Sequence, residues 1–103
     1  MPTTATSVTL SDINKAYGEK RYLSTISLSN AYLQNNPATY DILRIRYRTF
    51  FIIGKYDESL KEIQKIESMG LLDKTVACDA QAIATYGVNQ TLSATYAKVC
   101  AKK

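Results

Sequence analysis

The sequence contains no histidine and no tryptophan, and among its 103 residues only two are cysteine, two are proline and four are glycine. Without histidine, the chain lacks the most common general base and the most common metal ligand of proteins. Two cysteines alone do not make a four-ligand zinc site. The sequence also has no glycine-rich phosphate loop, nucleophile elbow or EF-hand loop. We therefore expect no catalytic residues, no metal site and no cofactor, and we expect that the chain is not an enzyme.

Long apolar runs and a one-sided charge are missing as well. The most apolar stretch, residues 49–53, is far shorter than the ~20 residues that a membrane span requires. The net charge is +4, yet Lys and Glu alternate over residues 55–67, which is typical of a solvated helix face. Only Arg44, Arg46 and Arg48 lie close together. The sequence therefore predicts no transmembrane segment and no nucleic-acid binding.

The overall composition, 46% hydrophobic and 21% charged, is that of an ordinary globular domain. Residues 1–9 are mostly Thr, Ser and other residues with little to bury, so we expect a flexible lead-in. They show neither the basic start nor the apolar block of a signal peptide. Residues 10–103 are expected to form a single domain of common size.

From residue 10 onward, apolar residues recur at three- and four-residue steps, which predicts helices. The clearest segment is 37–54, where Leu43 and Tyr47 fall on one side. The segment 21–35 is ambiguous, because residues 22–28 are also good strand formers. The sequence thus predicts an all-α fold with about six helices, over residues 10–18, 21–35, 37–54, 56–70, 73–87 and from 89 or 90 to the end.

An internal repeat connects these helices. Tyr22 and Tyr56 are 34 residues apart, and Gly54 and Gly87 are 33 apart. The stretch 54–60, Gly-Lys-Tyr-Asp-Glu-Ser-Leu, resembles the turn into the second helix of a tetratricopeptide repeat (TPR). The resemblance implies a degenerate three-repeat array, in which antiparallel helical hairpins stack as a short superhelix. The alternative is an unrelated helical bundle with a chance echo of the repeat.

The resemblance also implies a binding surface, because TPR proteins hold their partners in a groove lined by the first helix of each hairpin. The residues that it places in this groove are Asp41, Arg44, Arg48 and Phe51. Arg44 and Arg48 lie one helical turn apart and suit carboxylates, so an acidic segment is the expected ligand. The alternative is that both arginines only solvate an outer helix face. The corresponding positions of the third repeat would be Lys74, Ala77, Gln81 and Ala84, which would leave that part of the groove open.

The resemblance therefore favours a protein–protein interaction module, an adaptor, chaperone or scaffold that holds a helical or extended segment of another protein. Similar small helical-repeat proteins serve as chaperones and pilot lipoproteins in bacterial secretion and pilus systems. The alternative is a structural subunit or domain that packs permanently into a larger assembly. A further expectation concerns Arg46 and Asp79, which occupy positions where the repeat normally has an apolar residue. We expect both on the surface, with a pairing between neighbouring repeats as the alternative.

Two interpretations fit Cys78 and Cys100. If the last two helices form a hairpin about residues 86–89, the two cysteines lie almost side by side, within reach of a disulfide. That would indicate an oxidising compartment, so we expect a periplasmic or secreted protein. The alternative is a pair of buried thiols in a cytoplasmic protein.

Overall fold

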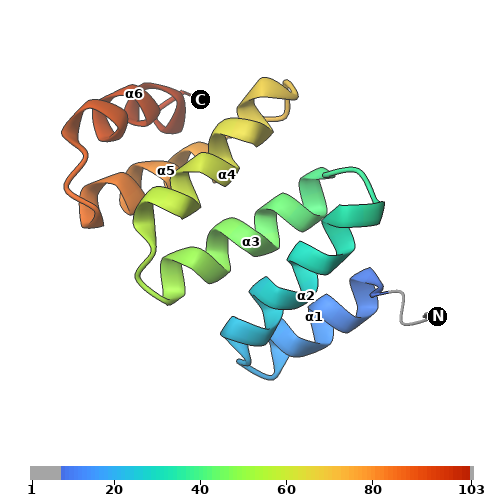
Figure 1. Cartoon of the computed structure of the whole chain (residues 1–103). Helices are drawn as coiled ribbons and strands as arrows, with labels where there is room; N and C mark the ends of the chain where they lie inside the picture. Colours follow the sequence, from blue (N-terminus) through green and yellow to red (C-terminus); the bar gives the residue numbers. More distant parts are fainter. Residues whose placement is uncertain (1–7, 103) are drawn as a thin grey trace.

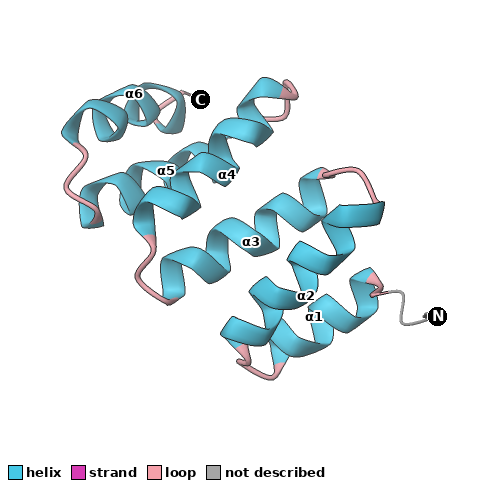
Figure 2. Cartoon of the chain, in the orientation of Figure 1, coloured by secondary structure: helices cyan, strands magenta, loops and turns pink. Residues whose placement is uncertain are grey.

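The computed structural model describes residues 8–102, which form six α-helices and contain no strand (Figure 2). The predicted all-α fold is confirmed, and the alternative of a strand at 22–28 is wrong because this segment is helical. Most of the predicted lead-in, residues 1–7, lies outside the described residues. The helices are α1 (Leu10–Gly18), α2 (Tyr22–Asn35), α3 (Tyr40–Ile52), α4 (Tyr56–Ser68), α5 (Lys74–Tyr86) and α6 (Gln90–Cys100).

The first helix begins with a reciprocal cap. The side chain of Thr9 accepts from the Asp12 backbone N–H, and the Asp12 carboxylate accepts from the Thr9 N–H at 2.9 Å. This capping box satisfies two backbone donors that a helix start leaves without partners. Val8, just before it, packs against the core. Residues 8 and 9 are therefore part of the folded domain.

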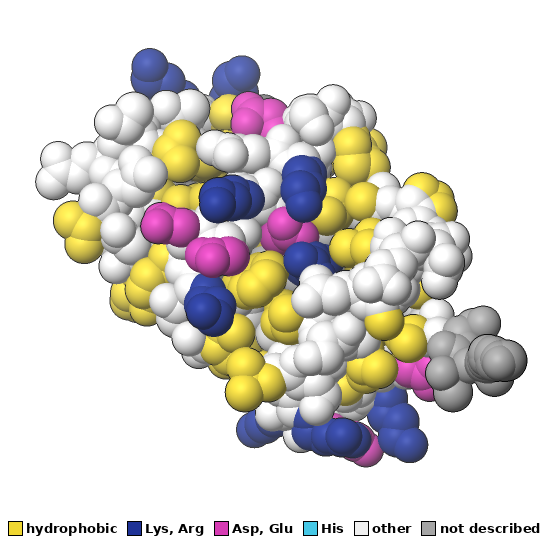
Figure 3. All heavy atoms as spheres, in the orientation of Figure 1, with side chains coloured by type: hydrophobic (Ala, Val, Ile, Leu, Met, Phe, Trp, Pro, Cys, Tyr) yellow, Lys and Arg dark blue, Asp and Glu magenta, His cyan; other side chains and the backbone are white. Residues whose placement is uncertain are grey.

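The six helices form three hairpins that stack in chain order (Figure 1). Each helix packs against its hairpin partner, α3 also contacts α1 and α2, and α5 contacts α4. The stack is elongated, 49 × 26 × 19 Å. One continuous core runs through it, and its largest fully buried members include Ile13, Ile42, Leu43, Tyr47, Ile63, Ile66 and Tyr96. On the face drawn in Figure 3, Lys and Arg side chains stand beside Asp and Glu side chains across the middle.

The turns inside the three hairpins share one geometry at a spacing of 34 residues. Lys20, Gly54 and Val88 have φ values of 62°, 81° and 58°, and each donates its backbone N–H to the carbonyl three residues earlier. The turn counterpart of Gly54 is thus Val88, and the pairing of Gly54 with Gly87 is wrong. Gly87 has an ordinary φ of −82°. Glycine is required at this position for a steric reason, because a Cβ there would lie 2.9 Å from the Cβ of Tyr56.

Arg46 corrects a second expectation. It is only 8% exposed, so its placement on the surface is wrong. Its Nε donates to Glu62 of α4, and one terminal nitrogen donates to Ser29 and Asn30 of α2, both at 2.7 Å. The guanidinium also lies over the ring of Phe50, 5.3 Å from its centroid. One buried cation on α3 thus joins the two helices on either side of it.

Cys78 of α5 and Cys100 of α6 lie at disulfide distance, with their Cα atoms 4.7 Å apart. The predicted side-by-side placement of the two cysteines is therefore confirmed. The bridge fastens a helix with little apolar burial, since Tyr96 is the one buried residue of α6.

We predict opposite effects for two substitutions at the hairpin turns. Val88→Gly should raise the free energy of unfolding by about 1 kcal/mol, because a left-handed conformation strains a residue with a Cβ. Val88 is 80% exposed, so little burial is lost. Gly54→Ala should lower stability by about as much, although its Cβ would meet no atom within 4 Å. Gly18→Ala, also in open space but without positive φ, is the control. Urea unfolding measures all three.

We also predict that protein unfolded without reductant contains no free thiol. The separation of 22 residues corresponds to a stabilisation of about 3 kcal/mol in the chain-entropy model. A double Cys78→Ser and Cys100→Ser variant should therefore unfold at lower denaturant concentration and be insensitive to reductant. Two titratable thiols in air-exposed wild-type protein would contradict the bridge.

Candidate functional site

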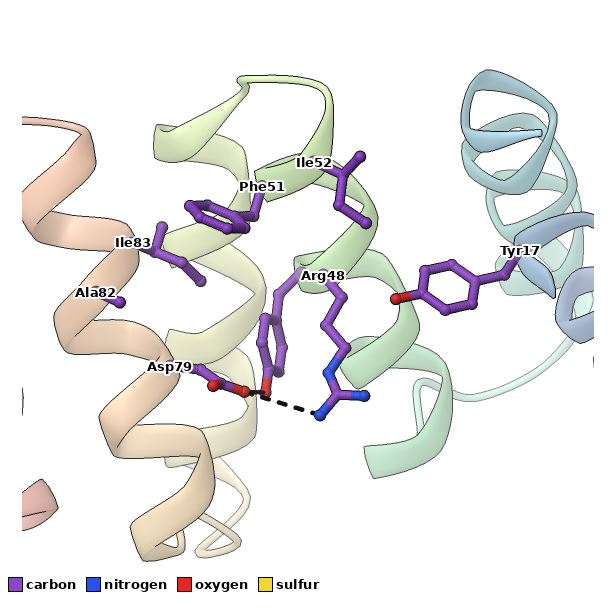
Figure 4. Close-up of a pocket in the computed structure, with 8 residues that line it drawn as sticks. Tyr17, Arg48, Phe51, Ile52, Asp79, Ala82 and Ile83 are labelled. Carbon is purple, nitrogen blue, oxygen red and sulfur yellow. Dashed lines mark hydrogen bonds and ion pairs between the residues drawn. The ribbon is translucent and has the colours of Figure 1, made fainter. Parts of the chain in front are cut away.

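A hollow lies between α1, α3 and α5 (Figure 4). It measures about 250 Å³, and a second hollow of about 310 Å³ continues it between α1 and α3. Both are lined by Tyr17 and Arg48, so together they form one groove. The other lining residues are Leu10 and Asn14 of α1, Asp41, Arg44, Ile45, Tyr47, Phe51 and Ile52 of α3, and Asp79, Ala82 and Ile83 of α5.

All four residues that the sequence placed on the binding surface lie along this groove. Arg48 and Phe51 line the first hollow, and Asp41, Arg44 and Arg48 line the second. They lie together because α3 is between α1 and α5 in the groove. Burial of the opposite side of α3, which includes Leu43, leaves these four side chains facing the groove.

The positions expected on α5 line neither hollow. Ala77 and Ala84 are fully buried, whereas Asp79, Ala82 and Ile83 line the groove. The expected positions on α5 were each one residue too early, because they were counted with the 33-residue spacing between Gly54 and Gly87. The 34-residue spacing of the turns pairs Arg48 with Ala82, which does line the groove. The same spacing pairs Tyr17 with Phe51, so it would also have found the missed Tyr17.

The end of the groove near the hairpin turns is apolar and aromatic. Figure 4 shows the ring of Tyr17 pointing from α1 toward Arg48 and Ile52 of α3. Phe51 is held by two neighbouring rings, with its centroid 5.7 Å from that of Tyr56 and 5.5 Å from that of Tyr86. This end of the groove can therefore receive one apolar side chain against a rigid wall.

One carboxylate stands in the apolar hollow. Asp79 accepts a hydrogen bond of 2.6 Å from the hydroxyl of Tyr47, and its other contact is with Arg48, 3.9 Å from a terminal nitrogen (Figure 4). Burial of the phenol, together with the hydrogen bond to Asp79 and its negative charge, raises the pKa of Tyr47 well above its usual value. Tyr47 is therefore a neutral donor that fixes the Asp79 carboxylate in place.

Arg44 differs from Arg48 in having no carboxylate partner. Within residues 8–102, the ion pairs involve other cations, and the Nε of Arg44 is buried without an acceptor. A buried donor without an acceptor is unfavourable. Arg44 is thus a cation of the groove with no carboxylate at ion-pair distance among the described residues.

The described residues give no sign of two other kinds of site. Each helix in residues 8–102 is too short or too polar to cross a membrane. The same residues contain no cluster of three or more acidic or cysteine side chains that could hold a metal ion. Compared with known protein families, curated proteins and solved structures, the chain matches none.

We predict that stability falls at alkaline pH because of the buried tyrosines. Burial, with help from Glu67, raises the pKa of Tyr96 from its ordinary 10.0 to about 12. The unfolded chain ionises first, so this stability is complete below pH 10 and is lost as the pH rises through 12. Tyr47, whose pKa is also raised, should act in the same direction.

Tyrosinate absorbance and unfolding curves, measured against pH, test this. Tyr96→Phe should lose less stability over this range than the wild type. Tyr86→Phe, which removes an exposed hydroxyl, is the matched control. If all tyrosines of the folded protein ionise together near their ordinary pKa, the burial of these two phenols is wrong.

Proposed function

We propose that the chain is a TPR-like interaction module that holds an acidic segment of another protein in the groove between α1, α3 and α5. The observation that carries this proposal is the pairing of an apolar hollow with Arg44, a cation without a carboxylate partner in the described residues. A segment that buries an apolar side chain and brings a carboxylate to Arg44 would complement both features. The proposal includes no catalytic step.

The TPR-like character of this proposal is supported by the repeat of the turns. Lys20, Gly54 and Val88 adopt the same left-handed conformation every 34 residues, which is the length of a TPR. Thr25 and Ser59, also 34 apart, are fully buried near the start of the second helix of their hairpins. Small residues there allow the two helices of a hairpin to approach closely.

The partner segment can be helical or extended, and the role that fits is that of an adaptor, chaperone or scaffold. We further propose a periplasmic or secreted location, in an envelope system such as bacterial secretion or pilus assembly. The placement of Cys78 and Cys100 at disulfide distance is compatible with an oxidising compartment. In the cytoplasm the two thiols would be kept reduced.

A second candidate function is that of a subunit packed permanently into a larger assembly. Exposed apolar side chains near the hairpin turns favour it, namely Leu23, Tyr86 and Val88. The two functions differ in solution. A permanent subunit would show a size and a stability that depend on its own concentration, whereas an adaptor would remain a monomer until it meets its ligand.

We predict that the wild-type protein selects acidic peptides with an apolar residue from a random peptide library. Arg44→Glu combined with Arg48→Glu should abolish this binding, because both cations of the groove become anions. The melting temperature should change little, since both side chains are only partly buried. Lys61→Glu combined with Lys98→Glu makes the same change of charge on α4 and α6, away from the groove, and should bind like the wild type.

Fluorescence anisotropy with the selected peptides provides the affinities. Equal binding by the groove variant and the control variant would place the interface elsewhere. A large loss of stability in the groove variant would instead show that the two arginines are structural.

A further inference from the structure

We propose that Asp79 determines the specificity of the groove. Its negative charge prevents Arg48 from binding a carboxylate of the partner, so that Arg44 alone receives that carboxylate. An uncharged apolar side chain of the partner enters the hollow beside Asp79. This inference rests on the proposed function and names the charge pattern of the segment that the groove accepts.

Asp79 is fixed in place by a hydrogen bond from the core. Its carboxylate oxygen accepts from the Tyr47 hydroxyl at 2.6 Å. Tyr47 is itself 1% exposed and packed in the core, so the donor has little freedom to move. Because Tyr47 remains protonated at neutral pH, this hydrogen bond holds an anion within the wall of the hollow.

Arg48 is paired loosely with the same carboxylate. Its guanidinium lies 3.9 Å from the same Asp79 oxygen, and the side chains of Arg48 and Asp79 are 39% and 37% exposed. This is a weak, solvated pair rather than a tight one. The pair nevertheless affects binding of a partner. A partner carboxylate that approaches Arg48 must also approach the negatively charged carboxylate of Asp79. The attraction and the repulsion largely cancel.

Arg44 lies one helical turn before Arg48 and is therefore displaced from it by about 6 Å along the axis of α3. Arg44 lines the hollow on the side of α1, where Asp79 is not among the lining residues. Its neighbour there is Asp41, which lies in the exposed first turn of α3 and makes no ion pair with it within 4.0 Å. A partner carboxylate therefore gains more from Arg44 than from Arg48.

Single and double variants test this order of importance. The probes are the acidic peptides selected from the random library, and the readout is their dissociation constant. Arg44→Ala should weaken binding about tenfold, and Arg48→Ala should change it less than twofold. Asp79→Asn should strengthen binding by about three- to tenfold, because the amide oxygen still accepts from Tyr47 while the negative charge is gone.

The double variant gives the sharpest result. In the Asp79→Asn background, adding Arg48→Ala should remove the gain in affinity, although the same Arg48→Ala change is nearly silent in the wild-type background. A second readout is the salt dependence of binding, which should become steeper in Asp79→Asn as a second cation joins the contact. Thermal unfolding of each variant checks that the fold is retained.

Three outcomes separate this inference from the proposed function. If wild-type protein binds the peptides but Asp79→Asn does not change their affinity, Asp79 is not the determinant. If Arg48→Ala weakens wild-type binding as much as Arg44→Ala does, Asp79 does not withhold Arg48. If the wild-type protein selects no acidic peptide, the proposed function itself is wrong, and this inference with it.

Discussion

The arrangement of the first two hairpins depends on one buried cation. Arg46 of α3 reaches Glu62 on its own hairpin partner and Ser29 and Asn30 on the preceding hairpin. Removing either member of a buried ion pair leaves an uncompensated charge, which costs about 3–5 kcal/mol. Any sliding of α3 along α2 would break these bonds in the same way. We infer that the pair fixes the position of α3 in the stack, and with it the groove that α3 shares with α1.

This interaction also shows where sequence reasoning fails. The helices were predictable because local spacing carries the signal, as in α3 and α4. The strand-like residues 22–28 are helical because α2 packs between α1 and α3, where Thr25 is fully buried and donates its hydroxyl to the carbonyl of Arg21. Tertiary packing thus overrides their local strand preference. Arg46 could not be predicted as buried, because its partner lies 16 residues away and is identified only by the packing of three helices.

The groove was predicted in part for a related reason. The four residues on α3 share one helix and one face, and the TPR resemblance of the adjoining stretch 54–60 placed them together. Placing α5 beside them required the exact repeat length, and the visible glycines, Gly54 and Gly87, gave 33 instead of 34. The true marker of the third turn is Val88, a residue type that rarely adopts positive φ. The period of a degenerate repeat is therefore difficult to read from its sequence, because the turn positions no longer all carry glycine.

The chemistry of the groove also bounds how tightly it can hold a partner. A hollow of about 250 Å³ accepts one apolar side chain, and the burial of that side chain is worth about 1.5–3 kcal/mol. One charge-assisted hydrogen bond to Arg44 adds about 1.5–3 kcal/mol. These contributions are far below the ~12 kcal/mol of a nanomolar complex, and association has its own entropic cost. A groove with a single anchor and a single available cation is therefore suited to a partner that is released again. Tight binding would require a longer segment that also covers the exposed side chains near the hairpin turns.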